Sequence, residues 1–142
     1  MYNILLAVDE TQDSPELMSD AVTNLPGANS EIEVLVLNVF AKFNVQGEGG
    51  SADSESVYNP EDLPKTVIDV RDQLQKNGVG ASIMSRHGEP GEEILSASEE
   101  HGVDLLIIGG RKRTPVGKAL FGSVAQRVLL EADCPVMQVR GE

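Results

Sequence analysis

The chain has 142 residues, with 23 acidic and 11 basic side chains and a formal net charge of -12. Its length fits one domain, so we expect residues 1–142 to fold as a single unit, and the acid excess argues against a nucleic-acid partner. The one cysteine, Cys134, excludes an internal disulfide and fits a reducing cytoplasm, and no apolar run reaches the roughly 18–20 residues that a membrane span needs.

Short apolar runs alternate with helical patterns along the first half of the chain. Run 3–8 predicts a strand, and the helix after it begins near Pro15 and ends before Pro26. Run 33–40 predicts the second strand. Apolar residues spaced four and three apart predict a second helix, from about 63 to the Asn77–Gly78 pair.

The same alternation continues to the end of the chain. Run 80–86 predicts a third strand, followed by a helix over about 91–101 that stops at Gly102. Runs 104–110 and 135–140 predict the last two strands, which flank a helix from about Ser123 to Ala132.

The order of elements predicts an α/β fold, a doubly wound five-stranded parallel sheet with helices on both faces. Ligands bind to such Rossmann-like sheets beyond the carboxyl ends of the strands, where the strand order reverses. The residues that follow the strands are therefore candidates: Asp9, Asn38 and Val39, His87 and Gly88, and the loop after 104–110. For His87 a plain turn is the simpler interpretation. Segment 41–60, rich in Gly, Ser and acids, predicts a flexible loop.

The stretch "GGRKRTPVGKALFGSVAQRVL", residues 109–129, reverses the charge of the chain locally. Five of the eleven basic residues lie between 111 and 127, with no acid among them. Gly122 and Ser123 open the last helix, where free backbone N–H groups favour an anion. Two simpler interpretations stay open: a solvated basic loop, and a capping box formed by Ser123 and Gln126.

These features resemble the universal stress protein family over essentially the whole chain. The resemblance rests on "ILLAVDET", "VLNVF", "HGEPGEEI", "DLLIIGGRKRTPVGKALFGSVAQRVL" and "CPVMQV". Nucleotide-binding members carry G-x2-G-x9-G-[ST], which falls here on Gly109, Lys112, Gly122 and Ser123. A lysine thus stands where a glycine is expected. Its bulk opposes a tight backbone turn, whereas its ammonium group is itself a phosphate ligand.

The resemblance implies further site residues. Asp9 would lie near the adenosine, although a turn cap is its simpler role, and Val39 would contact adenine through its main chain. Ala7 and Gly110 would flank the pocket. The expected nucleotide-binding set is Ala7, Val8, Asp9, Val39, Ile108, Gly109, Gly110, Arg111, Lys112, Gly122, Ser123 and Val124.

The implied function is a cytoplasmic stress-response protein that binds ATP or another adenine nucleotide, with or without Mg²⁺, and acts as a regulatory switch. One alternative is a chaperone-like or regulatory dimer that binds no nucleotide. The other is a slow nucleotide hydrolase, although no catalytic residue, nucleophile arrangement or protein metal site can be read from the spacing. The last strand, Pro135 to Arg140, would form an apolar sheet edge, so we expect a homodimer through it.

Overall fold

The computed structural model describes residues 1–8, 15–41, 63–110 and 123–140. Strands and helices alternate through this part of the chain. The strands are β1 Tyr2–Ala7, β2 Ile32–Ala41, β3 Gly80–Gly88, β4 Leu105–Gly110 and β5 Val136–Arg140. The helices are α1 Pro15–Thr23, α3 Lys65–Lys76, α4 Pro90–His101 and α5 Ser123–Glu131.

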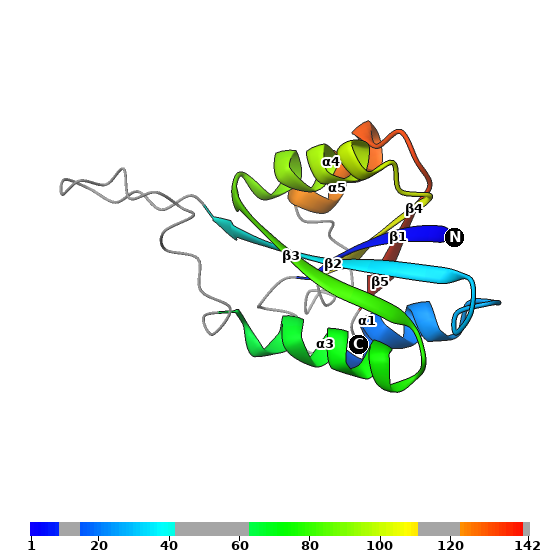
Figure 1. The fold of residues 1–142 in the computed structure, drawn as a ribbon. Helices are drawn as coiled ribbons and strands as arrows, with labels where there is room; N and C mark the ends of the chain where they lie inside the picture. The colour runs from blue at the N-terminus through cyan, green and yellow to red at the C-terminus, as the bar shows by residue number, and fades with distance from the viewer. Residues whose placement is uncertain (9–14, 42–62, 111–122, 141–142) are drawn as a thin grey trace, which may run out of the picture.

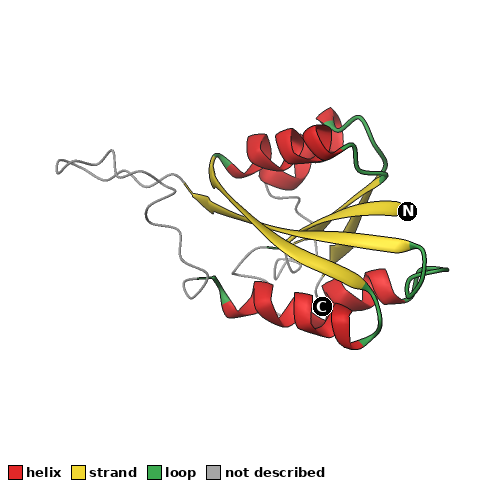
Figure 2. Cartoon of the chain, viewed as in Figure 1, coloured by secondary structure: helices red, strands yellow, loops and turns green. Residues whose placement is uncertain are grey.

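All five strands are parallel and lie in the order β3-β2-β1-β4-β5. In Figure 1, α1 and α3 cover one face of the sheet and α4 and α5 cover the other, as Figure 2 also shows by element type. The predicted doubly wound α/β fold is confirmed. The strands predicted from the apolar runs agree with the observed ones, except that β3 continues past residue 86 to Gly88.

Each central strand divides its side chains between two cores. In β2, Val34 and Val36 belong to the core under α1 and α3, and Leu37 belongs to the core under α4 and α5. Because both faces of the strand are buried, its sequence is a nearly continuous apolar run. This burial explains why the strands could be predicted from the apolar runs of the sequence.

Glycines end two of the helices as predicted. Gly78 follows α3 with φ 82° and Gly102 follows α4 with φ 55°, both in the left-handed region. After α3, the amides of Gly78 and Val79 donate to the carbonyls of Gln75 and Leu74, and the same pattern follows α4. This hydrogen-bond pattern satisfies the last carbonyls and turns the chain into the next strand.

One expectation about a single residue was wrong. His87 is not in a turn: it lies in β3, opposite Phe40 of β2, and the two rings stack with centroids 4.9 Å apart. The stacking and the strand pairing together keep the backbone extended. Cys134 is half-buried and packs at the margin of the core under α4 and α5.

Candidate functional site at the carboxyl edge of the sheet

The strand order reverses between β1 and β4. From β1 the chain moves outward to β2 and β3, and it then returns to β4 on the other side of β1. The last residue of β1, Ala7, lies opposite Leu37 of β2 and Ile108 of β4. The carboxyl ends of three strands thus meet around Ala7, and this is the position at which such sheets bind ligands.

The predicted residues on these strands lie on both faces of the edge. Ala7, Val39 and Ile108 pack toward the core under α4 and α5, and Val8 packs toward the core under α1 and α3. The amide of Val8 donates to the carbonyl of Leu37 at 3.0 Å, which extends the pairing one residue past β1. Gly109 and Gly110 continue β4 beyond Ile108.

Helix α5 begins with Ser123, which is exposed, while Val124 packs against the core beneath the helix. The capping box of Ser123 and Gln126 was one open interpretation, and in the structure Ser123 is the first residue of the helix. The residue before it in the sequence, Gly122, lies outside the described residues. A four-residue connection, 132–135, joins α5 to the amino end of β5, so α5 starts toward the carboxyl edge of the sheet.

Helix α4 also starts at this edge, directly after β3, but it supplies its own anion. The Glu89 carboxylate accepts hydrogen bonds from the amides of Gly91 at 3.3 Å and Glu92 at 2.8 Å. The positive end of the α4 dipole is thus neutralised within the protein.

Arg127, one of the five basic residues in the loop-and-helix stretch, is committed to ion pairs. Its Nη1 lies 2.7 Å from Oε2 of Glu89 and its Nε lies 3.2 Å from Oε2 of Glu131. These contacts tie α5 to the start of α4. Arg127 therefore belongs to the helix layer, and the basic residues left for a phosphate are those between β4 and α5.

Four of the predicted site residues lie outside the described residues: Asp9, Arg111, Lys112 and Gly122. So does the part of segment 41–60 beyond the end of β2. Of the predicted set, the structure brings Ala7, Val8, Val39 and Ile108 together with the two glycines of β4. It places Ser123 and Val124 at the start of α5.

A second charged cluster joins β3 to α4. The guanidinium group of Arg86 contacts the carboxylates of Glu93, at 3.7 Å, and of Glu100. The hydrogen bond from Arg86 and its positive charge lower the pKa of Glu100 below its ordinary value of 4.5. Burial raises the pKa of the Cys134 thiol, so this thiol stays neutral near pH 7.

Two buried polar atoms on this edge lack partners among the described residues. Asn38, a candidate by its position in the sequence that was not kept in the predicted set, is only 3% exposed. Its Nδ2 atom and the Oγ atom of Ser85 are buried, and no described residue hydrogen-bonds to either. Ser85 was not predicted, because a serine in a weakly apolar strand carries no signal of its own.

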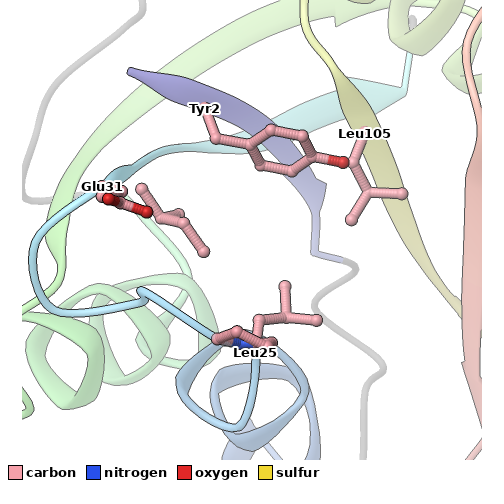
Figure 3. Close-up of a pocket in the computed structure, with 6 residues that line it drawn as sticks. Tyr2, Leu25, Glu31 and Leu105 are labelled. Carbon is pink, nitrogen blue, oxygen red and sulfur yellow. The ribbon is translucent and has the colours of Figure 1, made fainter.

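A hollow of about 300 Å³ lies at the opposite, amino end of the sheet. Figure 3 shows Tyr2, Leu25 and Leu105 around it, with Glu31 at one side. Its lining residues are Tyr2, Leu25, Pro26, Glu31, Ile32 and Leu105. It lies away from the strand ends discussed above and shares no residue with the predicted set.

Neither a metal cluster nor a spanning helix is found within the described ranges. No group of three or more His, Cys, Asp or Glu side chains there could hold a metal ion. No described helix has the length and hydropathy to cross a membrane.

The parallel order, the reversal at β1 and β4 and the helix start beside them define a doubly wound α/β protein with a switch-point binding edge. The chain belongs to the universal stress protein family, whose model matches residues 1–140.

Two relatives illustrate the similarity. The chain is 27% identical to the universal stress protein YxiE of Bacillus subtilis, over 99% of this chain and 100% of that protein. It is 48% identical to a universal stress protein of Mycolicibacterium smegmatis over 75 residues, which are 52% of this chain and 58% of that one.

Solved structures agree with the fold. A universal stress protein from Archaeoglobus fulgidus superposes with a TM-score of 0.73 at 26% identity, covering 98% of both chains. A universal stress protein structure from the same organism in complex with dAMP superposes at 0.67 with 18% identity, again covering 98% of both chains. The second likeness shows the fold alone.

Proposed function

We propose that this chain binds an adenine nucleotide at the carboxyl edge between β1 and β4 and acts as a nucleotide-dependent regulatory switch. The base and ribose would lie against Ala7, Val8, Asp9, Val39 and Ile108. The phosphates would lie against the backbone of the remaining set: Gly109, Gly110, Arg111, Lys112, Gly122, Ser123 and Val124. ATP, with or without Mg²⁺, is one candidate within this class.

The observation that carries the proposal is the contrast between two helix starts at one edge. Helix α4 neutralises its first amides with Glu89, whereas α5 begins at Ser123, directly after a glycine and a basic stretch in the sequence. An anion at α5 would meet free N–H groups and the positive end of the helix dipole. The family also includes a solved complex with dAMP.

The first test asks what the purified protein carries. Protein prepared without added nucleotide is denatured, and the supernatant is measured by mass spectrometry and compared with that of Asp9→Ala. A stoichiometric adenine nucleotide in the wild type, reduced in the variant, is the expected result. Absence of nucleotide, together with no heat of binding on titration with AMP and ATP, would overturn the proposal.

The lysine at position 112, where the nucleotide-binding motif has a glycine, favours a competing function: a regulatory dimer that binds no nucleotide. If the lysine acts as a phosphate ligand, Lys112→Gly weakens binding, by about ten- to hundredfold for one lost charge-assisted hydrogen bond. If Lys112→Gly instead creates binding that the wild type lacks, the natural site is closed and the dimer is the better description. Metal-dependent turnover lost in Asp9→Ala would instead indicate a slow hydrolase.

Three further expectations belong to the same proposal: a single domain spanning residues 1–142, a cytoplasmic location, and a homodimer formed through β5. The position of β5 supports the last one, since this strand is at one edge of the sheet. An exposed strand edge offers unpaired backbone groups to a second copy of the chain.

A further inference from the structure

Asn38 and Ser85 form a polar pair near the carboxyl end of a sheet face whose inner rows are apolar. They lie opposite each other in the register of β2 and β3, strands that run side by side in Figure 1. Two residues toward the amino end of the strands, Val36 and Ile83 pack in the core under α1 and α3. Two residues toward the carboxyl end, the rings of Phe40 and His87 stack. The polar pair thus marks where the core stops.

The Nδ2 atom of Asn38 and the Oγ atom of Ser85 are both buried, although the Ser85 residue as a whole is half-buried. Asn38 is 3% exposed, and neither atom has a hydrogen-bond partner among the described residues. A buried polar group without a partner destabilises the fold, whereas an aliphatic residue of similar size would not. A bound molecule that accepts a hydrogen bond from the Asn38 amide would supply the missing partner.

The pair lies in one row with the proposed nucleotide site. Val8 follows Ala7, whose partners are Leu37 and Ile108, so Asn38, Val8 and Gly109 stand at the same level on three neighbouring strands. Alternation places all three on the face that α1 and α3 cover. Strands lie about 4.8 Å apart, so Asn38 and Gly109 are roughly 10 Å apart across the row. A nucleoside has about this reach from its base to its phosphate-bearing carbon.

We propose that the Asn38 carboxamide, supported by the Ser85 hydroxyl, recognises the base of the bound nucleotide and selects adenine over guanine. This inference rests on the proposed function and names a specificity-determining residue within it. A carboxamide offers N–H donors and an oxygen acceptor side by side, which complement the acceptor nitrogen and exocyclic amine of adenine. Guanine presents a carbonyl oxygen where adenine presents the amine. A site that depends on these hydrogen bonds rejects the wrong base strongly.

Asn38→Leu tests the inference, because leucine nearly matches asparagine in size and removes both polar groups. We measure binding of AMP and GMP to the wild type and the variant by titration calorimetry, and thermal melting of both proteins without ligand. We expect the wild type to prefer AMP, and the variant to lose about ten- to hundredfold in AMP affinity, as for one to two hydrogen bonds, and with it the preference. The ligand-free variant should melt at a higher temperature, since a buried unpaired amide is gone.

Two companion variants keep the test decisive. Ser85→Ala should reduce the preference for AMP in the same direction, and Asn38→Ala serves if leucine prevents folding. Ser98→Ala is the matched control: Ser98 is also buried, but its hydroxyl donates to the Leu95 carbonyl within α4, so base preference should stay unchanged.

The outcomes separate the two proposals. A wild type that binds AMP and an Asn38→Leu variant with the same AMP preference overturn this inference and leave the proposed function standing. A variant that melts lower yet binds normally assigns Asn38 to the fold, through a buried water for example, and also overturns it. A wild type that binds neither AMP nor ATP overturns both.

Discussion

The guanidinium group of Arg127 lies between two carboxylates, 2.7 Å from Glu89 and 3.2 Å from Glu131. In the sequence, Arg127 is one member of a basic cluster, with nothing to separate it from Arg111 or Lys112. In the structure it ties two helices together. Roles of single charged residues are therefore decided by what the fold brings near them.

Arg127→Gln should cost little stability and leave nucleotide binding intact. Both ion pairs are partly exposed, so the expected loss in the free energy of unfolding is about 0.5–1 kcal/mol at low salt and less at high salt. Urea titration measures this loss, with Arg71→Gln as a control, since within the described ranges Arg71 pairs only with its exposed neighbour Asp72. A large loss of AMP affinity in Arg127→Gln would instead show that Arg127 takes part in nucleotide binding.

Glu100 provides a test of pH dependence. The Arg86 guanidinium group lowers the pKa of Glu100 in the folded protein from its ordinary value of 4.5. Its contribution to stability is therefore full above pH 4.5 and is lost as the pH falls through the lower folded-state pKa.

Glu100→Gln should accordingly be less stable than the wild type at neutral pH, and the difference should shrink in acid. Urea unfolding of both proteins across this range measures it, with Glu99→Gln as the control on the same helix. A difference that stays constant with pH would show that the ion pair is not its source.

At the scale of elements, the ends of the helices divide structural from functional positions. Helix α4 is capped by Glu89 at its start and by the left-handed Gly102 at its end, so its own residues account for both termini. Helix α5 begins at Ser123, directly after a glycine in the sequence, and a glycine has no side chain that could act as a cap. The start of α5 is therefore the better candidate for a bound anion.

Glu89→Ala should destabilise the protein by about 1–2 kcal/mol, because it removes the cap of α4 and one partner of Arg127. Glu92→Ala is the matched control, since Glu92 shares the charge and the first turn but does not supply the cap oxygen. Thermal and urea unfolding of the two variants measure the difference. Equal losses would mean that only the helix dipole responds to these acids.

At the scale of the whole molecule, the two helix layers cover both faces of the sheet (Figure 2), and β3 and β5 form its two edges. Val136 packs toward one core, and Met137 and Val139 pack toward the other. Since both faces of β5 contribute to the two cores, pairing with a second β5 would continue the sheet and both cores across a two-fold axis. Exposed Leu130 on α5 adds apolar surface outside the cores.

A single cysteine on β5 tests this association. In a Cys134→Ser background, Gln138→Cys should form an intermolecular disulfide on mild oxidation, because the centre of the strand would lie near the axis. Ser82→Cys in the same background, on the opposite edge strand, should not. Sedimentation of the wild type over a dilution series gives an independent readout, and a monomer at every concentration would contradict the dimer.

The sequence by itself determined the elements, the parallel architecture and the family. Strand and helix periods are local properties, and strands buried on both faces, such as β1 and β2, cannot be mistaken for solvent-facing ones. Gly78 and Gly102 marked helix ends because a left-handed residue is a local requirement. The sequence also predicted a candidate site at the carboxyl ends of the strands, because ligands bind such sheets there, and the structure places Ala7 of β1 beside Ile108 of β4.

Only the tertiary structure decided which distant side chains meet. Arg127 reaches Glu89 across 38 positions of sequence, and Asn38 of β2 lies opposite Ser85 of β3 although α3 comes between them in the chain. His87 stays in its strand because Phe40 lies beside it. No local pattern encodes such pairs, because each depends on strand order and register and so on the packing of the whole sheet.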